Sequence, residues 1–166
     1  MNAKIKRIVA IFLTLLLIVS TVGTFVSCDK KEASTVEKLS KEEYEIYLIV
    51  TENLYKFKDP SSVIIGLAYK AVNGCAVLYI NANDSLGITR GEFYCVFIED
   101  YFFNNGSSKF EKGTMLSTED VSYTLSTAED KRSFMNIING LSDAPHYDEL
   151  ALNDALIEYR LNHGIT

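Results

Sequence analysis

Two cysteines in the middle of the chain have a spacing that could support covalent chemistry. Cys75 and Cys95 lie in two apolar stretches separated by turn residues at 83–87. If these stretches form a β-hairpin centred on Ser85, the two cysteines face each other directly across the strands, where disulfide geometry is attainable. Buried cysteines without any bond are also common core residues. Both a disulfide and a pair of core thiols are therefore open interpretations.

The two histidines, His146 and His163, could act as acid–base groups or metal ligands. His146 follows Pro145 at the expected start of a helix, and His163 precedes Gly164 at the expected end of that helix. Capping and solvent-exposed roles are ordinary at such positions. The sequence has no nucleophile elbow, phosphate loop, HExxH or EF-hand pattern. We therefore predict no catalytic residue, no metal ligand and no cofactor.

Two groups of polar side chains could contact a ligand. The first group lies in the expected turn and comprises Asn81, Asn83, Asp84 and Ser85. Its oxygens suit a hard cation such as calcium, but the same residue types serve a turn through backbone hydrogen bonds. The second group comprises Tyr44, Tyr47, Tyr55, Tyr69 and Tyr79. They could line a groove, although tyrosines at helical or strand spacing more often belong to the core with the hydroxyl at its rim.

These residues need a helix and a sheet to position them. Ser40 and Glu43 form a capping box, and the apolar stripe that follows predicts a helix of about four turns that Asp59-Pro60 ends. Alternation and β-branched content predict strands over residues 63–69, 75–82 and 91–101, of which the last two form the hairpin.

The second half of the domain is expected to add short strands and two helices. Short strands are expected at 115–116 and 121–125. A capping box over 126–129 predicts a helix that ends near Gly140, and a last helix is expected over 148–162 with Gly164 as its stop. The sequence thus predicts an α+β fold: an N-terminal helix, a small antiparallel sheet of about three or more strands, and C-terminal helices packed on it. One N-terminal helix covers only one sheet face, so another segment or solvent must cover the other.

The first residues have the composition of an export signal rather than of a folded domain. Lys4, Lys6 and Arg7 precede the apolar run 8–19, and small or apolar residues follow up to Ser27. This order predicts a signal peptide over residues 1–27. An uncleaved signal anchor is the other interpretation, because a stretch of this length could span a bilayer at the short end of the range.

The end of that signal resembles the lipobox of bacterial lipoproteins. Phe25-Val26-Ser27-Cys28 has the small residue before the cysteine, with Phe25 where leucine is usual. The resemblance implies acylation of Cys28, which becomes the first residue and holds the protein on the outer face of a membrane through two or more acyl chains. Residues 28–39 are then expected to form a flexible tether, and residues 40–166 a single domain.

Two segments resemble elements of a small domain found in many uncharacterised bacterial secreted proteins. Residues 57–63 (FKDPSSV) are similar to its helix-ending LKDPSSV element. Residues 79–87 (YINANDSLG), followed by Arg90, are similar to its VDAQNSFG strand and turn, with leucine in place of the usual phenylalanine. The segment 152–159 is similar to the closing helix of that domain. The resemblance implies the same fold with 103–145 as an insertion, and it implies no activity.

The negative net charge of the chain excludes one class of partner. The formal net charge is −6, and loss of residues 1–27 would remove three of 16 basic residues and none of the 22 acidic ones, which gives −9. Such a surface repels phosphate backbones, so nucleic acid is excluded as a partner. Arg90 and Glu92 are expected to form at most a weak structural ion pair.

The sequence therefore predicts a lipid-anchored, non-catalytic binding domain on the extracytoplasmic face of the cell membrane, with a protein or small molecule as its partner. The alternative is a small extracytoplasmic enzyme or inhibitor module whose site is assembled from distant residues. Glu92 and Glu99 buried close together would favour that alternative. A ligand-binding lipoprotein that serves a transporter ranks third, because the chain is short for a two-lobed clamp.

Overall fold

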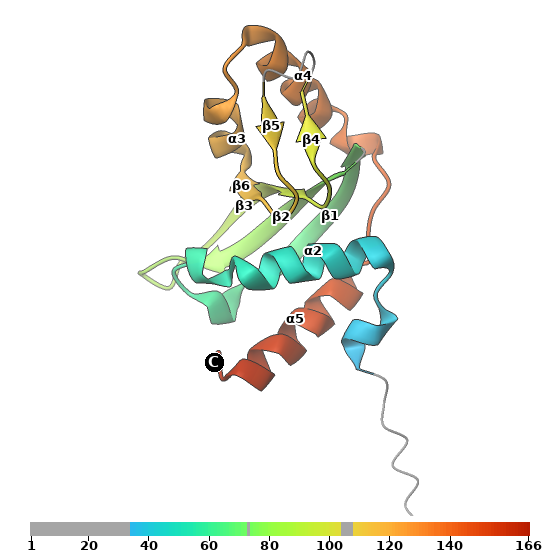
Figure 1. Ribbon diagram of the computed structural model, residues 1–166. Helices are drawn as coiled ribbons and strands as arrows, with labels where there is room; N and C mark the ends of the chain where they lie inside the picture. The colour runs from blue at the N-terminus through green and yellow to red at the C-terminus, as the bar shows by residue number, and fades with distance from the viewer. Residues whose placement is uncertain (1–33, 73, 104–107) are drawn as a thin grey trace, which may run out of the picture. The chain divides into compact units, whose positions relative to one another are not determined.

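A computed structural model describes residues 34–72, 74–103 and 108–166. The expected signal peptide, the expected lipidation site Cys28 and the first part of the expected tether lie outside the described residues. Within the described part of the chain, no helix is both long and apolar enough to span a membrane. The described residues form an α+β unit with a four-stranded antiparallel sheet between two layers of helices (Figure 1), which confirms the predicted fold class.

The main sheet has the strand order β1-β2-β3-β6, and every neighbouring pair is antiparallel. Its strands are β1 Ile64–Val72, β2 Cys75–Asn83, β3 Thr89–Phe97 and β6 Met115–Ser117. A second, two-stranded sheet joins β4 Tyr101–Phe102 and β5 Lys109–Phe110. Four α-helices accompany the sheets in the described residues: α2 Lys41–Glu52, α3 Thr118–Thr124, α4 Ala128–Asn139 and α5 Glu149–His163. Short 3-10 helices are η1 Thr35–Lys38, η2 Leu54–Lys56, η3 Pro60–Ser62 and η5 Leu141–Asp143.

Helices α2 and α5 cover one face of the sheet. The predicted capping box starts α2, because the Ser40 hydroxyl accepts from the Glu43 N–H while the Glu43 carboxylate accepts from the Ser40 N–H. Asp148 caps α5, and Gly164 ends it in the left-handed conformation with φ 66°. The first core lies between these helices and the sheet. Its fully buried members include Ile46, Val50, Leu78, Ile80, Val96, Leu152 and Leu156.

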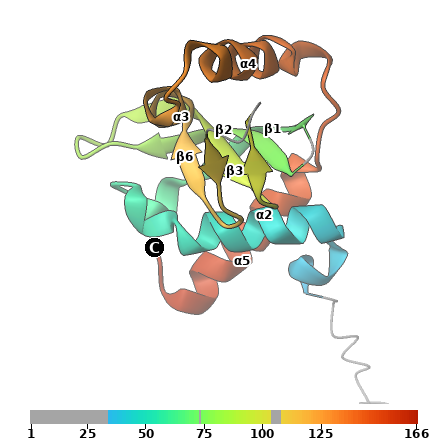
Figure 2. The same ribbon diagram turned by 45° about the horizontal axis from the view of Figure 1, so that its top comes forward.

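The segment from β4 to η5 covers the other face (Figures 1 and 2). It builds a second core, whose members include Val77, Cys95, Phe97, Phe103, Phe110, Val121, Leu125 and Phe134. The region expected to be an insertion, 103–145, therefore supplies both the missing cover and β6, a strand of the main sheet. Successive residues of β2 alternate between the cores: Val77 enters the second and Leu78 the first.

The hairpin register differs from the prediction by two residues. Cys75 faces Phe97 and Cys95 faces Val77, so the two cysteines are diagonal neighbours on one sheet face, not a directly facing pair. The turn is centred on Leu86, because the Asp84 carboxylate accepts from the backbone N–H groups of Leu86 and Ile88 and the Asp84 N–H donates to the Ile88 carbonyl. The expected centre on Ser85 was wrong.

Three other predictions about the elements were wrong. Residues 121–125 belong to α3 and its C-cap, not to a strand, because the Ser117 hydroxyl caps a helix by accepting from the Asp120 N–H. Helix α4 is capped by Thr127, one residue later than expected. Helix α2 ends at Glu52, and η2 replaces its expected last turn.

The folded unit also begins earlier than predicted. The Glu158 carboxylate accepts hydrogen bonds from the Ser34 hydroxyl at 2.9 Å and from the Thr35 N–H at 3.0 Å. Val36 and Leu39 pack against the first core. Residues 34–39 are therefore part of the domain rather than of the tether.

Candidate functional site

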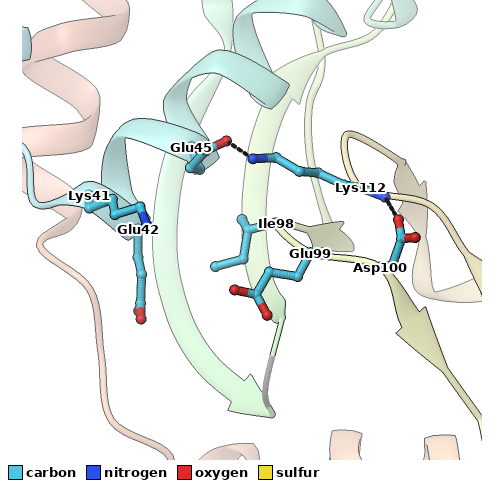
Figure 3. Close-up of a pocket in the computed structure, with 7 residues that line it drawn as sticks. All are labelled: Lys41, Glu42, Glu45, Ile98, Glu99, Asp100 and Lys112. Carbon is cyan, nitrogen blue, oxygen red and sulfur yellow. Dashed lines mark hydrogen bonds and ion pairs between the residues drawn. The ribbon is translucent and has the colours of Figure 1, made fainter.

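A hollow of about 360 Å³ lies between the start of α2 and the loop that follows β3 (Figure 3). We call it the acidic hollow. Its lining residues are Lys41, Glu42, Glu45, Ile98, Glu99, Asp100 and Lys112. Four carboxylates and two ammonium groups therefore meet in one place, with the Ile98 side chain between them.

Glu42 is held by two donors from distant parts of the chain. The Lys70 ammonium lies 2.6 Å from its Oε2, and the Tyr147 hydroxyl donates to the same oxygen at 3.1 Å. These bonds lower the pKa of Glu42, with the Lys70 bond as the main cause, although partial burial acts in the opposite direction. Burial and the Glu42 carboxylate together raise the pKa of the Tyr147 hydroxyl. Glu42 is therefore an ionised, oriented carboxylate at neutral pH.

Lys112 joins the two walls of the hollow. Its ammonium lies 2.8 Å from Glu45 Oε2 on α2, and its backbone N–H donates to Asp100 Oδ1 at 2.9 Å. The second oxygen of Asp100 lies 3.0 Å from the Lys109 ammonium. The backbone bond from Lys112 and the bond from Lys109 lower the pKa of Asp100. The loop after β3 is thus fixed to helix α2 by charged contacts.

Glu99 is positioned by a close backbone approach. Gly74, with φ 76°, accepts from the N–H groups of Ile98 and Glu99, and a Cβ at Gly74 would lie 2.9 Å from the Glu99 Cβ. In Figure 3 the carboxylates of Glu42, on α2, and Glu99, on the loop after β3, both lie below Ile98. The lining has four carboxylates against two ammonium groups, an excess that suits binding of a cationic group.

A second, smaller hollow of about 170 Å³ lies along the loop-proximal half of the β2–β3 hairpin, and we call it the hairpin groove. It is lined by Lys56, Phe57, Lys58, Ile80, Ala82, Asn83, Asp84, Arg90, Glu92 and Tyr94. The two segments that carry the family resemblance meet beside it. The Asn83 N–H donates to the Ser62 hydroxyl at 2.8 Å, and the Asn83 side chain donates to Asp59 at 3.2 Å. These motif residues therefore tie η3 to the hairpin, which is a structural role.

The structure brings Cys75 and Cys95 close together but leaves both as thiols in the second core. A hydrogen bond with the Cys95 thiol and burial raise the pKa of the Cys75 thiol. The directly facing geometry that motivated the disulfide is not formed, because the register is shifted.

Each histidine ring packs against a tyrosine ring, tilted for His146 and stacked for His163. The ring of His146 lies 4.6 Å from that of Tyr69, and its Nδ1 is 3.2 Å from Glu149 Oε1. His163 lies 4.0 Å from the Tyr159 ring, and its Nδ1 is 2.8 Å from the Tyr159 carbonyl oxygen. Neither histidine lines the acidic hollow or the hairpin groove.

The other candidate groups are dispersed or occupied. Among the five tyrosines only Tyr44 and Tyr47 stack on each other, while Tyr79 packs on Phe93, so no common groove forms from them. In the described residues, no group of three or more histidine, cysteine or acidic side chains could hold a metal ion. Asp84 serves the turn.

The expected ion pair and the expected acid pair do not form. Arg90 pairs with Asp84 at 2.8 Å rather than with Glu92, whose carboxylate instead accepts from the Tyr94 hydroxyl at 3.0 Å. Glu92 and Glu99 are both exposed and line different hollows. The carboxylate pair that would favour an enzyme is therefore absent at these two residues.

Sequence reasoning missed Glu42, Glu45 and Lys112 as site residues. Glu42 and Glu45 have the ordinary appearance of acids in the first turns of a helix, and Lys112 lies about 70 residues away in the sequence. Only the packing of the loop after β3 against α2 brings them together. No family model, no curated protein and no solved structure matches this chain.

Proposed function

We propose that the chain is an extracytoplasmic lipoprotein, anchored through Cys28, whose folded domain binds a cationic partner in the acidic hollow. The preferred partner is a basic segment of a protein. The observation that carries the proposal is that four carboxylates, Glu42 and Glu99 among them, line one hollow.

The electrostatics of the domain support this choice. The chain has 22 acidic and 16 basic residues, so a positive partner is attracted from a distance. Lys112, a lining residue, orients Glu45 through an ion pair, and Lys70, which lies outside the lining, orients Glu42 in the same way. Such fixed carboxylates require little reorganisation when a lysine or arginine side chain enters.

The anchor is tested by the intact mass of the mature protein from its host membrane. A chain that starts at Cys28 with added acyl mass is expected. The matched control is Cys28→Ala, which should lack the acyl mass. A wild-type chain that retains residues 1–27 without lipid would overturn the proposed anchor.

Binding is tested by fluorescence anisotropy with a labelled peptide of alternating lysine and glycine. The double variant Glu42→Gln and Glu99→Gln is expected to weaken binding about tenfold or more, since each lost charge contact contributes on the order of 1 kcal/mol. The control is Glu37→Gln with Glu129→Gln, which removes the same charge from exposed positions outside the hollow. Equal loss in both variants would show a nonspecific charge effect and contradict the proposed site, as would no binding by the wild type.

A further inference from the structure

The two edges of the main sheet differ in how far their backbone groups are hydrogen-bonded. The outer edge of β1 is bonded along its length: the Asn153 carboxamide pairs with both backbone groups of Ile65, at 2.9 and 2.8 Å, and Glu149 accepts from the Ala68 N–H at 3.2 Å. On the other side of the sheet, β6 pairs only with residues 94–96 of β3. Within the described residues, no strand pairs with the outer edge of 89–93.

The backbone of that open edge points toward solvent. The hydrogen bond from the Asp84 N–H to the Ile88 carbonyl closes the hairpin, so the even-numbered residues of β3 bond to β2. The odd-numbered residues face outward, as Phe97 does when it donates to Thr114 and accepts from Gly113. The N–H and C=O groups of Thr89, Gly91 and Phe93 therefore form an unpaired strand edge, which is a template for another strand.

The side chains on this edge are complementary to a second copy of themselves. Arg90 and Glu92 are exposed and lie on the same face of β3, one residue on either side of Gly91. If two copies of β3 pair antiparallel about a two-fold axis at Gly91, Arg90 of each copy lies directly opposite Glu92 of the other. That pair is of the closely spaced, non-hydrogen-bonded kind. Gly91 exchanges both backbone hydrogen bonds with Gly91 of the second copy.

Both charged side chains have a partner within their own copy and keep capacity for a second one. The Arg90 Nε donates to Asp84 at 2.8 Å, which uses one of five N–H donors and directs the guanidinium along the edge. On the opposite face, Tyr79 lies so close over Gly91 that a Cβ there would overlap its hydroxyl. The two Tyr79 rings would then meet near the two-fold axis, so both faces of the junction are complementary.

We propose that the chain forms a two-fold symmetric dimer through residues 89–93 of β3, with Arg90 and Glu92 of the two copies paired across the axis. The sheet continues from one copy into the next. Because Arg90 and Glu92 also line the hairpin groove, the second copy forms the missing wall of that groove. Other registers place like charges opposite each other or leave charges unpaired, which restricts pairing to this one.

The test uses two differently tagged full-length copies, co-expressed and purified through one tag from detergent-solubilised membranes. Two wild-type copies are expected to purify together. Arg90→Glu in both copies, or Glu92→Arg in both, places like charges opposite each other and should reduce recovery of the second copy about tenfold or more. Arg90→Glu in one copy with Glu92→Arg in the other restores opposite charges and should restore recovery.

The mixed pair separates an interface from a folding defect, because a misfolded copy would stay misfolded in the mixture. The controls are Lys131→Glu in both copies and Glu129→Arg in both copies, single charge reversals at exposed positions of α4, and recovery should equal that of the wild type. Equal recovery with the like-charged variants, no recovery with the mixed pair, or a different protein bound at this edge in place of the second copy would each overturn the proposal.

Discussion

The side chain of Asn153 makes a sharp prediction about stability. It replaces a neighbouring strand: its Nδ2 donates to the Ile65 carbonyl at 2.8 Å, and its Oδ1 accepts from the Ile65 N–H at 2.9 Å. Asn153→Ala removes both bonds at a half-buried site. Each contributes about 1 kcal/mol net, with an added penalty for backbone groups that water reaches poorly, so the expected loss is about 2–3 kcal/mol.

Asn153→Asp refines the prediction, because it keeps the acceptor and replaces the donor. At neutral pH its carboxylate faces the Ile65 carbonyl, so the loss should be at least that of Asn153→Ala. This contact favours the protonated acid and raises the folded pKa of the new carboxyl above its unfolded value. The protonated carboxyl therefore stabilises the folded protein fully below its unfolded pKa of about 3.9, and this stabilisation is lost as the pH rises through its folded pKa. The difference between Asn153→Asp and wild type in the free energy of unfolding should shrink as the pH falls.

Urea unfolding followed by circular dichroism measures both variants. The matched control is Asn162→Ala, an exposed position on the same helix, which should change the free energy of unfolding by no more than about 0.5 kcal/mol. If Asn153→Ala unfolds within about 0.5 kcal/mol of wild type, the carboxamide does not stabilise the sheet edge and the reasoning is refuted.

Three further predictions concern the packing of the second core, the reactivity of the two thiols and the loss of stability at low pH. Phe134 is 3 % exposed, so Phe134→Ala should cost about 3–5 kcal/mol in thermal or urea unfolding, whereas Met135→Ala, at 48 % exposed, should cost little. Cys75 and Cys95 should resist alkylation in the folded protein and react on unfolding without reductant; reaction only after reduction would show a disulfide. Glu158 has a folded pKa below its ordinary 4.5, so its stabilisation is present above that value and lost as the pH falls. Glu158→Gln should therefore flatten the acid limb of a stability–pH curve, and an unchanged limb would contradict this.

The start of α2 and the end of α5 could be predicted from the sequence because local chemistry determines them. The capping box of Ser40 and Glu43 begins α2 and Gly164 ends α5, and the structure confirms both. The same logic would have identified α3. Ser117 followed by Glu119 and Asp120 is a helix start, and Val121 and Leu125 have helical rather than strand spacing.

The hairpin register could not be predicted from turn composition alone. Several residues of 83–87 are compatible with the central position, and the choice depends on which backbone groups the Asp84 carboxylate accepts from. Shifting the turn centre by one residue moves the pairing by two. That shift keeps every side chain on its predicted face but changes each direct partner, which is why Cys95 faces Val77.

The acidic hollow depends on long-range packing and left no signal in the sequence. Its walls come from α2 and from the loop after β3, which Lys112 and Gly74 position. The segment from β4 to η5 covers the second face of the sheet, and this role could not be predicted from the sequence for the same reason. Its aromatic residues are recognisable as apolar, but their partner is a sheet face assembled from residues 64–97.

The two-sided burial of β2 has a consequence for how the domain opens. This strand is bonded to β1 and β3 on its two sides, and its residues alternate between two cores. Hydrogen exchange of its central amides then requires loss of both helical layers at once, so these protons should report the free energy of global unfolding. Exchange near the loop at 84–88, where neither core reaches, should be governed by local fraying. The proposed pairing edge therefore lies where the backbone can adjust to a partner without opening the rest of the fold.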